Sequence, residues 1–201
     1  MGTAHNIIRT AYKKGIRLLG AGCYSAVMDY SKDTVLKIGA DMSDPYLHFL
    51  ENIEKINNPH FPRVQDIYID VKHSFYLVKL EKLYSLSEAT LTTRYPSLYD
   101  WVFKEKPIPT WASDKMIEAV NYLLTMTDYK NFSDAANKEK EGLTIDLDSC
   151  KLDLHESNIM EREDGTLVFT DPLCNCIMYD VPDLEAWVKL ELKVAECSAA
   201  W

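Results

Sequence analysis

Apolar and polar residues alternate in short segments over the first 83 positions, which is the pattern of antiparallel strands. Five segments are predicted strands: Ile16–Ala21, Ser25–Tyr30, Val35–Ile38, Val64–Val71 and Ser74–Leu80. A helix is predicted between the third and the fourth, because Asp44 can cap it, Pro45 suits its first position and Asn57–Pro59 would end it. The first part of the chain is therefore predicted to be a five-stranded antiparallel sheet with one helix.

The rest of the chain changes to helical spacing, which makes the predicted fold class α+β. Helices are predicted at Ser85–Thr93, Pro96–Lys104 and Ser113–Met126, and Asp164-Gly165 marks a hairpin between Ile159–Arg162 and Thr166–Thr170. A last helix is predicted from Pro182 to Cys197. Because apolar residues lie on most of its faces, this helix is expected to be deeply buried or to contact another chain, such as a second copy in a homodimer.

Composition and charge narrow the classes of protein. Among 201 residues, 22 Lys and Arg stand against 31 Asp and Glu, a net charge of −9, and 47% of the residues are hydrophobic. This composition is typical of a globular protein, and its acidity disfavours direct nucleic-acid binding. No apolar run is long enough to cross a membrane, and Met1–Arg17 lacks the apolar block of a signal peptide. The odd number of cysteines, five, favours a reducing, cytoplasmic setting.

Gly20 and Gly22 form a G-x-G pattern at the end of the first predicted strand. Paired glycines let the backbone approach phosphate oxygens and present N–H groups to them, although a plain β-turn gives the same pattern. In a dinucleotide-binding fold the glycines would run into a helix, whereas here they run into the strand that contains Ser25 and Val27. A glycine-rich hairpin that covers a nucleotide is therefore favoured.

Lys37 lies among aliphatic residues of the third predicted strand, 15 residues after Gly22. Such a lysine either extends to water or has an anionic partner, and this is where a kinase keeps the lysine that holds the nucleotide's phosphates. Glu51 and Glu54 of the following predicted helix are the candidate carboxylates. At about 100° per residue, Glu54 borders the buried face and Glu51 points further out, so Glu54 is preferred and Glu51 is the alternative.

The segment from Asp153 to Asn158 carries the strongest chemical signal. An Asp followed five residues later by Asn, just before an apolar strand, is the spacing of a kinase catalytic loop, although an Asx-rich turn is the simpler interpretation. In such a loop the carboxylate orients the attacking hydroxyl and accepts its proton, while the amide oxygen holds Mg²⁺ without adding charge. Asp171 follows Asn158 by 13 residues, at the end of another apolar strand, in the place of a second metal ligand.

Together these features resemble the protein kinase family, and more closely the early serine/threonine protein kinases of T-seven-like bacteriophages. The resemblance lies in residues 19–26, 35–39, 153–160 and 170–172, so it is spread over most of the chain. It implies a minimal bilobal kinase-like fold, with residues 1–83 as the N-lobe and residues 84–201 as a mainly helical C-lobe with a truncated end. It also implies an enzyme that uses ATP and Mg²⁺ to phosphorylate host proteins, and itself, in the cytoplasm of a bacterial host.

The resemblance also implies a role for each matched residue. Lys37 would bind the α- and β-phosphates, Asp153 would be the catalytic base, and Asn158 and Asp171 would hold Mg²⁺. The hinge at Leu80–Leu83 would read adenine through its backbone. The implied nucleotide-binding residues are then Gly20, Gly22, Ser25, Val27, Lys37, Glu81 and Leu83.

Departures from the kinase pattern keep two other functions open. His155, in the catalytic loop, stands where protein kinases usually have lysine, and a histidine there is typical of aminoglycoside and choline kinases. Pro172 and Leu173 replace the usual Phe-Gly, and only 30 residues follow Asp171, too few for the usual peptide-binding platform. One alternative is therefore a small-molecule phosphotransferase, and the other is a kinase-derived protein that inhibits a host protein by binding it.

The remaining polar groups receive simpler interpretations. Cys174 and Cys176 are expected to be thiols rather than metal ligands, because no matching pair of Cys or His lies at a suitable spacing. His48, His60 and His73 show no pairing pattern and are expected to lie on the surface.

Overall fold

The structure, a computed structural model, describes residues 3–22, 24–40, 44–95, 98–103, 108–127 and 150–175. These residues divide into two compact units: residues 3–47 and 64–82 form the first, and residues 48–63 and 83–175 form the second. The predicted lobe boundary at residue 83 assigns residues 48–63 to the N-lobe, whereas in the structure these residues belong to the second unit. The helix predicted at Pro182–Cys197 lies outside the described residues, as do Cys23 and Cys176.

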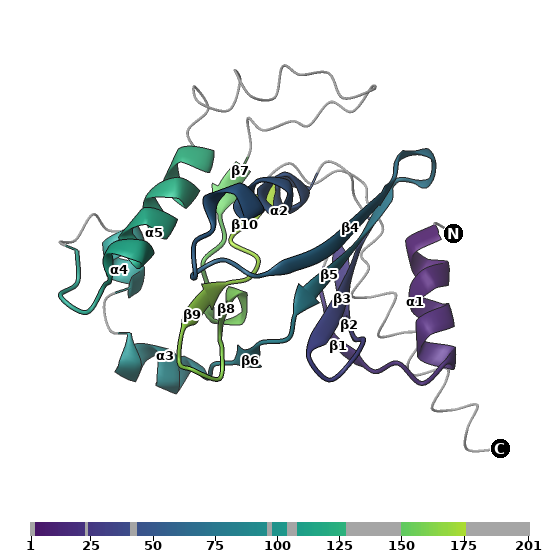
Figure 1. Ribbon diagram of the computed structural model, residues 1–201, viewed down its shortest axis with the longest axis horizontal. Coiled ribbons are helices and arrows are strands. Elements are labelled where there is room, and N and C mark those ends of the chain that lie inside the picture. The colour runs from purple at the N-terminus through teal and green to yellow at the C-terminus, as the bar shows by residue number, and fades with distance from the viewer. Residues whose placement is uncertain are drawn as a thin grey trace. The chain divides into compact units, whose positions relative to one another are not determined.

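The first unit is built on the predicted five-stranded antiparallel sheet (Figure 1). Its strand order is β1-β2-β3-β5-β4, with β4 and β5 joined by the short 3-10 helix η1 (Val71–His73). All five predicted strands are confirmed to within two residues at each end: β1 (Leu18–Ala21), β2 (Ser25–Asp29), β3 (Thr34–Gly39), β4 (Val64–Asp70) and β5 (Phe75–Glu81).

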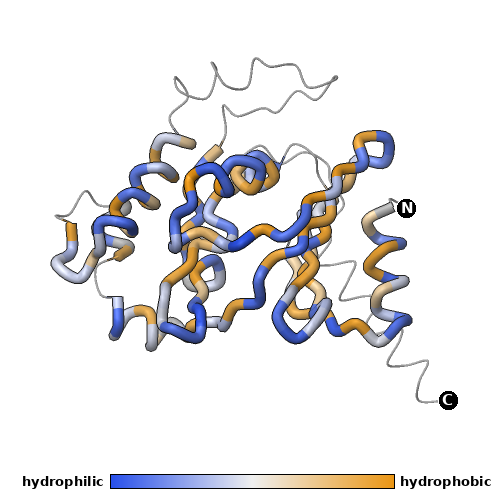
Figure 2. Tube along the Cα trace, viewed as in Figure 1, coloured by the Kyte–Doolittle hydropathy of each residue, from blue (hydrophilic) through white to orange (hydrophobic). Residues whose placement is uncertain are grey.

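One face of this sheet is covered by α1 (Thr3–Lys13), a helix that the sequence interpretation missed (Figure 1). Ala4, Ile8 and Ala11 of α1 are buried in one cluster with strand residues such as Met28 and Ile38. Their spacing of three and four residues is the helical signal, and Figure 2 shows hydrophobic positions recurring between hydrophilic ones along α1. Because side chains alternate along a strand, Lys37 lies on the opposite face from Ile38 and α1.

The helix α2 (Pro45–Ile56) begins where the sequence predicts, at a capping aspartate. The Tyr46 backbone N–H donates to Asp44 Oδ1 at 2.9 Å, and the Tyr76 hydroxyl donates to Asp44 Oδ2 at 2.6 Å. Asp44 therefore fixes the start of α2 to the sheet, since Tyr76 belongs to β5. The ring of Tyr76 covers Gly39, its partner across β3 and β5.

Among the described residues, the second unit contains residues 48–56 of α2, three further α-helices and two small sheets. The helices are α3 (Glu88–Arg94), α4 (Leu98–Phe103) and α5 (Asp114–Met126), and the predicted hairpin is formed by β8 (Ile159–Glu161) and β9 (Leu167–Phe169). These two strands join β6 (Tyr84–Ser85) in the order β6-β8-β9, while β7 (Cys150–Leu152) pairs with β10 (Leu173–Asn175). Among the described residues, no helix has the length and hydropathy needed to cross a membrane.

The contact between Gly39 and Tyr76 gives a prediction about stability. A Cβ at Gly39 would lie 2.0 Å from atoms of the Tyr76 ring, whereas a Cβ at Gly20 would meet no atom within 4 Å. We expect Gly39→Ala to lower the free energy of unfolding by about 1–3 kcal/mol, because the ring must move out of a packed core. Gly20→Ala is the matched control and should change it by less than about 0.5 kcal/mol. Urea denaturation measures both, and equal stability of the two variants would contradict this close packing.

Candidate active site

Backbone pairing in the second unit brings Asp153, Asn158 and Asp171 into one cluster. The strands β7 and β10 place Leu152 opposite Leu173, and the Asp153 N–H donates to the Pro172 carbonyl at 2.8 Å. On the other side of Asp171, the Thr170 N–H donates to the Asn158 carbonyl at 2.9 Å. Asp171 therefore lies between two backbone hydrogen bonds, one to each end of the loop that holds Asp153 and Asn158.

The side chains of this loop are tied together as well. Asn158 Nδ2 donates to the Asp153 carbonyl oxygen at 2.8 Å and to Asp153 Oδ2 at 3.2 Å. His155 Nε2 lies 3.6 Å from the same Oδ2, and the Asp153 side chain is 42% exposed. The arrangement presents an oriented and accessible carboxylate, which can accept a proton from a group that approaches from solvent.

The cluster contains oxygen atoms of the kind that Mg²⁺ prefers as ligands. Mg²⁺ prefers oxygen ligands and is usually held by one or two protein groups together with phosphates and waters. Because Asn158 Nδ2 is engaged by Asp153, the amide offers Oδ1 as its ligand atom, and Asp171 offers a carboxylate. Among the described residues, no group of three or more His, Cys, Asp and Glu side chains is placed to hold a metal ion.

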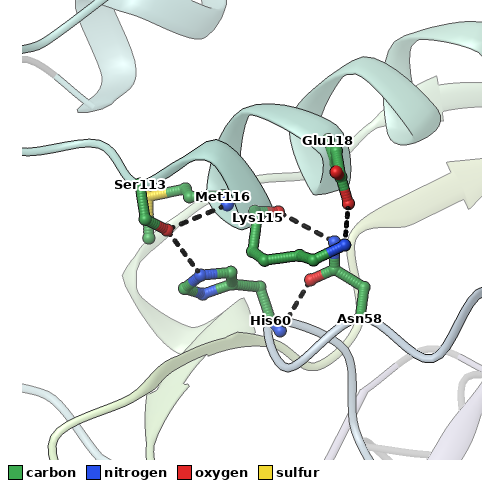
Figure 3. A network of polar contacts seen from close by, with 6 residues as sticks. All are labelled: Asn58, His60, Ser113, Lys115, Met116 and Glu118. Carbon is green, nitrogen blue, oxygen red and sulfur yellow. Dashed lines mark hydrogen bonds and ion pairs between the residues drawn. The ribbon is translucent and has the colours of Figure 1, made fainter.

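The strand that leads to Asp171 is held by His60. The sequence analysis expected His60 on the surface, but it is buried. His60 Nδ1 lies 2.8 Å from the Leu167 carbonyl oxygen, and the Phe169 N–H donates to the His60 carbonyl at 2.9 Å. The Nε2 atom lies 3.4 Å from Oγ of Ser113, the residue that caps α5 by accepting from the Met116 N–H (Figure 3). The expectation failed because it rested on sequence neighbours, whereas these partners are more than 50 residues away. His73 lies on the surface as expected and pairs with Asp70.

In the first unit, Lys37 lies in a row of strand residues on the face opposite α1. It is paired with Val27 of β2 on one side and with Val78 of β5 on the other. Only 3% of Lys37 is exposed, and its Nζ lies 3.5 Å from the centroid of the Tyr46 ring. The negative face of an aromatic ring attracts a cation, so Tyr46 stabilises the buried ammonium. Tyr46 was missed because this cation–π contact depends on how α2 begins beside the sheet.

The glycine-rich segment forms the predicted turn between β1 and β2. The Gly22 N–H donates to the Ser25 carbonyl at 2.8 Å, and Gly20 pairs with Val27. A Cβ at either glycine would have no atom of the described residues within 4 Å, so the described part of the chain does not crowd these two positions. Ser25 lies two residues before Val27 and shares its face of the sheet. Ser25 and Val27 are therefore on the same face as Lys37.

The predicted hinge leaves the end of β5. Glu81 pairs with Thr34, and the Lys82 N–H donates to the Asp33 carbonyl at 3.0 Å. The Lys82 ammonium pairs with the Asp29 carboxylate, and this hydrogen bond holds the pKa of Asp29 below its usual value. Leu83 is half-buried in the second unit.

Burial on α2 is the reverse of what the helical angle predicts for the two candidate glutamates. Glu54 is exposed, whereas Glu51 is half-buried. At about 100° per residue Glu54 lies between Leu47 and Leu50, which are both buried, so the helical angle alone does not account for its exposure. Burial therefore no longer favours Glu54 over Glu51, and the partner of Lys37 stays a prediction.

Comparisons with known proteins found neither a family model nor a curated protein that matches this chain. Among solved structures, the crystal structure of Rad53 1-466 in complex with AMP-PNP is similar, with 18% sequence identity and a TM-score of 0.42. The similarity covers 77% of this chain and 36% of that chain, so this chain spans about a third of that structure. A likeness at this TM-score carries nothing about the activity of this chain.

The contact between Lys37 and Tyr46 can be measured by a double-mutant cycle. Lys37→Met and Tyr46→Leu, made singly and together, should give a coupling of about 0.5–2 kcal/mol in the free energy of unfolding, because the ring faces a desolvated cation. Tyr46→Phe is the control, since it retains the ring. A coupling of zero within error would mean that the ring and the ammonium do not interact.

Burial also makes the stability of the fold depend on pH through His60. Burial lowers the pKa of His60, with a smaller contribution from the positive charge of Arg162 on the hairpin, while the bond to Leu167 opposes this. The unfolded chain takes up the proton near pH 6.5, whereas the folded chain resists it to a lower pH. The free energy of unfolding should therefore fall as the pH drops below about 6.5.

The variant His60→Asn is the control for this pH dependence, because other titratable groups of the chain remain in it. The charged residues Lys115 and Glu118 of α5 lie in the same network and pair with each other (Figure 3). Burial also lowers the pKa of His5, which lies in α1. His60→Asn leaves these groups in place, so urea denaturation at pH 7.5 and 5.5 should give a smaller fall for this variant than for the wild type. An equal fall would show that His60 is not the titrating group.

Proposed function

We propose that this chain is an ATP- and Mg²⁺-dependent phosphotransferase with a minimal bilobal kinase-like fold, which transfers a phosphoryl group to serine and threonine hydroxyls of proteins. The observation that carries this proposal is the pairing of Asp153, Asn158 and Asp171 by backbone hydrogen bonds on both sides of Asp171. A base, an amide and a second carboxylate in this arrangement match the parts that phosphoryl transfer requires.

Asp153 is the base in the proposed reaction. The acceptor hydroxyl oxygen forms a bond to the γ-phosphorus, and its proton passes to the Asp153 carboxylate. The bond between the γ-phosphorus and the oxygen that bridges it to the β-phosphate breaks, and ADP leaves. Asn158 supports the base, because its Nδ2 contacts both the carbonyl and the carboxylate of Asp153.

The remaining groups bind the nucleotide in this proposal. Asn158 Oδ1 and Asp171 would hold Mg²⁺, which supplies charge neutralisation at the β- and γ-phosphates. Lys37 would bind the α- and β-phosphates, and Val27, its neighbour in the row, would contact the base of the nucleotide. The backbone of Gly20 and Gly22 would lie against the phosphates, and that of Glu81 and Leu83 would read adenine.

The acceptor in this proposal is a protein of a bacterial host, and the enzyme itself is a further acceptor. The resemblance to early phage kinases is what supports both, together with action in the host cytoplasm. A small-molecule acceptor is the second candidate, and it is favoured by the position of His155 beside Asp153. A stoichiometric inhibitor of a host protein is the third, and there the nucleotide-binding residues would be dispensable.

A transfer assay tests the leading proposal. Radiolabelled ATP, Mg²⁺ and a bacterial cytosolic extract should give labelled protein bands, and Asp153→Asn should lower their labelling by about 10²–10⁴-fold because the base is lost. Asp66→Asn on β4 is the matched control, since that carboxylate is 65% exposed and belongs to the first unit; it should retain wild-type labelling.

The same assay separates the alternatives. Label found only in the low-molecular-mass fraction would support the small-molecule acceptor. Full labelling by Asp153→Asn would remove the assigned role of Asp153. If the wild type transfers no label while Lys37→Ala and Asp153→Asn retain the full biological effect, the chain acts by binding.

A further inference from the structure

We infer that His60 is a positioning residue for Asp171. Its side chain and backbone form hydrogen bonds to the open edge of β9, and these bonds fix the segment that carries the second magnesium ligand. The kinetic part of this inference rests on the proposed function, because it assigns Asp171 to Mg²⁺. The structural part, that His60 restrains residues 167–170, depends only on the hydrogen bonds in the structure.

The edge of β9 is where His60 acts. This strand is the last in the order β6-β8-β9, so one side of it has no strand partner in that sheet. The N–H and C=O groups of Leu167 and Phe169 face the open side, and His60 binds two of them. The Phe169 N–H donates to the His60 carbonyl at 2.9 Å, and His60 Nδ1 donates to the Leu167 carbonyl at 2.8 Å. Because a carbonyl only accepts, Nδ1 carries the proton of the neutral ring.

His60 is in turn held from two directions. Its backbone N–H donates to Asn58 Oδ1 at 2.9 Å, and Asn58 Nδ2 donates to the Lys115 carbonyl on α5 at 2.8 Å (Figure 3). Arg162 donates to the carbonyls of Pro59 and Phe61, which flank His60 in the chain. Asn58 is 6% exposed and His60 is 8% exposed, so water has little access to compete for these bonds.

The hold on β9 reaches Asp171 through the backbone. The next residue after β9 is Thr170, whose N–H bonds the Asn158 carbonyl, and Asp171 follows it. If β9 moves along its edge, Thr170 and Asp171 move with it relative to Asn158. His60 therefore acts on the geometry of the two proposed ligands without touching either one, as outer-shell partners do at metal sites.

Two substitutions distinguish this role from simple packing. His60→Asn retains an N–H donor near the position of Nδ1, whereas His60→Leu fills the space without a donor. We expect His60→Leu to raise the Mg²⁺ concentration for half-maximal transfer by about 10-fold, since outer-shell changes cost 10–100-fold in metal affinity or activity. His60→Asn should stay within about twofold of the wild type. Met28→Ala is the control for lost stability, because Met28 is fully buried in the first unit.

Amide hydrogen exchange gives a readout that needs neither metal nor activity. In His60→Leu the amides of Phe169 and Thr170 should exchange at least about 10-fold faster than in the wild type, because the edge of β9 opens more often. In His60→Asn they should exchange at nearly the wild-type rate. Met28→Ala should leave the ratio of these two amides to those of α5 unchanged.

The outcomes separate the inference from the proposed function. If the wild type transfers no phosphate, the proposed function fails, and the exchange rates still decide whether His60 holds β9. Unchanged exchange in His60→Leu overturns the inference, and so does equal acceleration in His60→Asn. If transfer occurs and Met28→Ala raises the Mg²⁺ requirement as much as His60→Leu does, the effect is one of stability and the positioning role is excluded.

Discussion

The pairing of β7 with β10 is the constraint on which the candidate site depends. It sets Leu152 opposite Leu173, and the adjoining bond from the Asp153 N–H to the Pro172 carbonyl fixes the loop that follows β7 against the segment that precedes β10. In an antiparallel pair, a slip of one residue turns every side chain to the other face. Such a slip here would shift Asp153 relative to Asp171, so the arrangement of the cluster depends on these backbone hydrogen bonds.

In the first unit, a second constraint is the stabilisation of a buried lysine in the sheet. Lys37 has valine on both sides in its row and is almost fully buried, where an ammonium loses most of its hydration. The cation–π contact with the ring of Tyr46 offsets part of the free energy lost with that hydration. Tyr46 is itself placed by Asp44, whose carboxylate also binds the Tyr76 hydroxyl. The environment of Lys37 is therefore fixed by the same capping aspartate that starts α2.

The sheet and the cluster were predictable from sequence for different reasons. The strands from β1 to β5 follow from local alternation, and Asp153 and Asn158 from a spacing of five residues within one loop. The helix α1 was missed because its buried face relies on alanines, which give a weak apolar signal. Tyr46 and His60 could not be found in this way, since each acts on a residue that only folding brings near; His60 and Leu167 are 107 positions apart. For Glu51 and Glu54 the helical angle did not predict burial, since Glu54 is exposed although Leu47 and Leu50 beside it are buried.

The loop at residues 57–62 shows why a histidine is needed at the edge of β9. The three strands of that sheet have only two or three residues each, and strands this short need support along their edges. A fourth strand would give that support by alternating N–H and C=O groups, and His60 does present its carbonyl to Phe169. Two residues further on, where a strand would present its next N–H, stands Pro62, which has none. The imidazole of His60 supplies the missing donor to Leu167, so a side chain completes a ladder that the backbone of this loop cannot make.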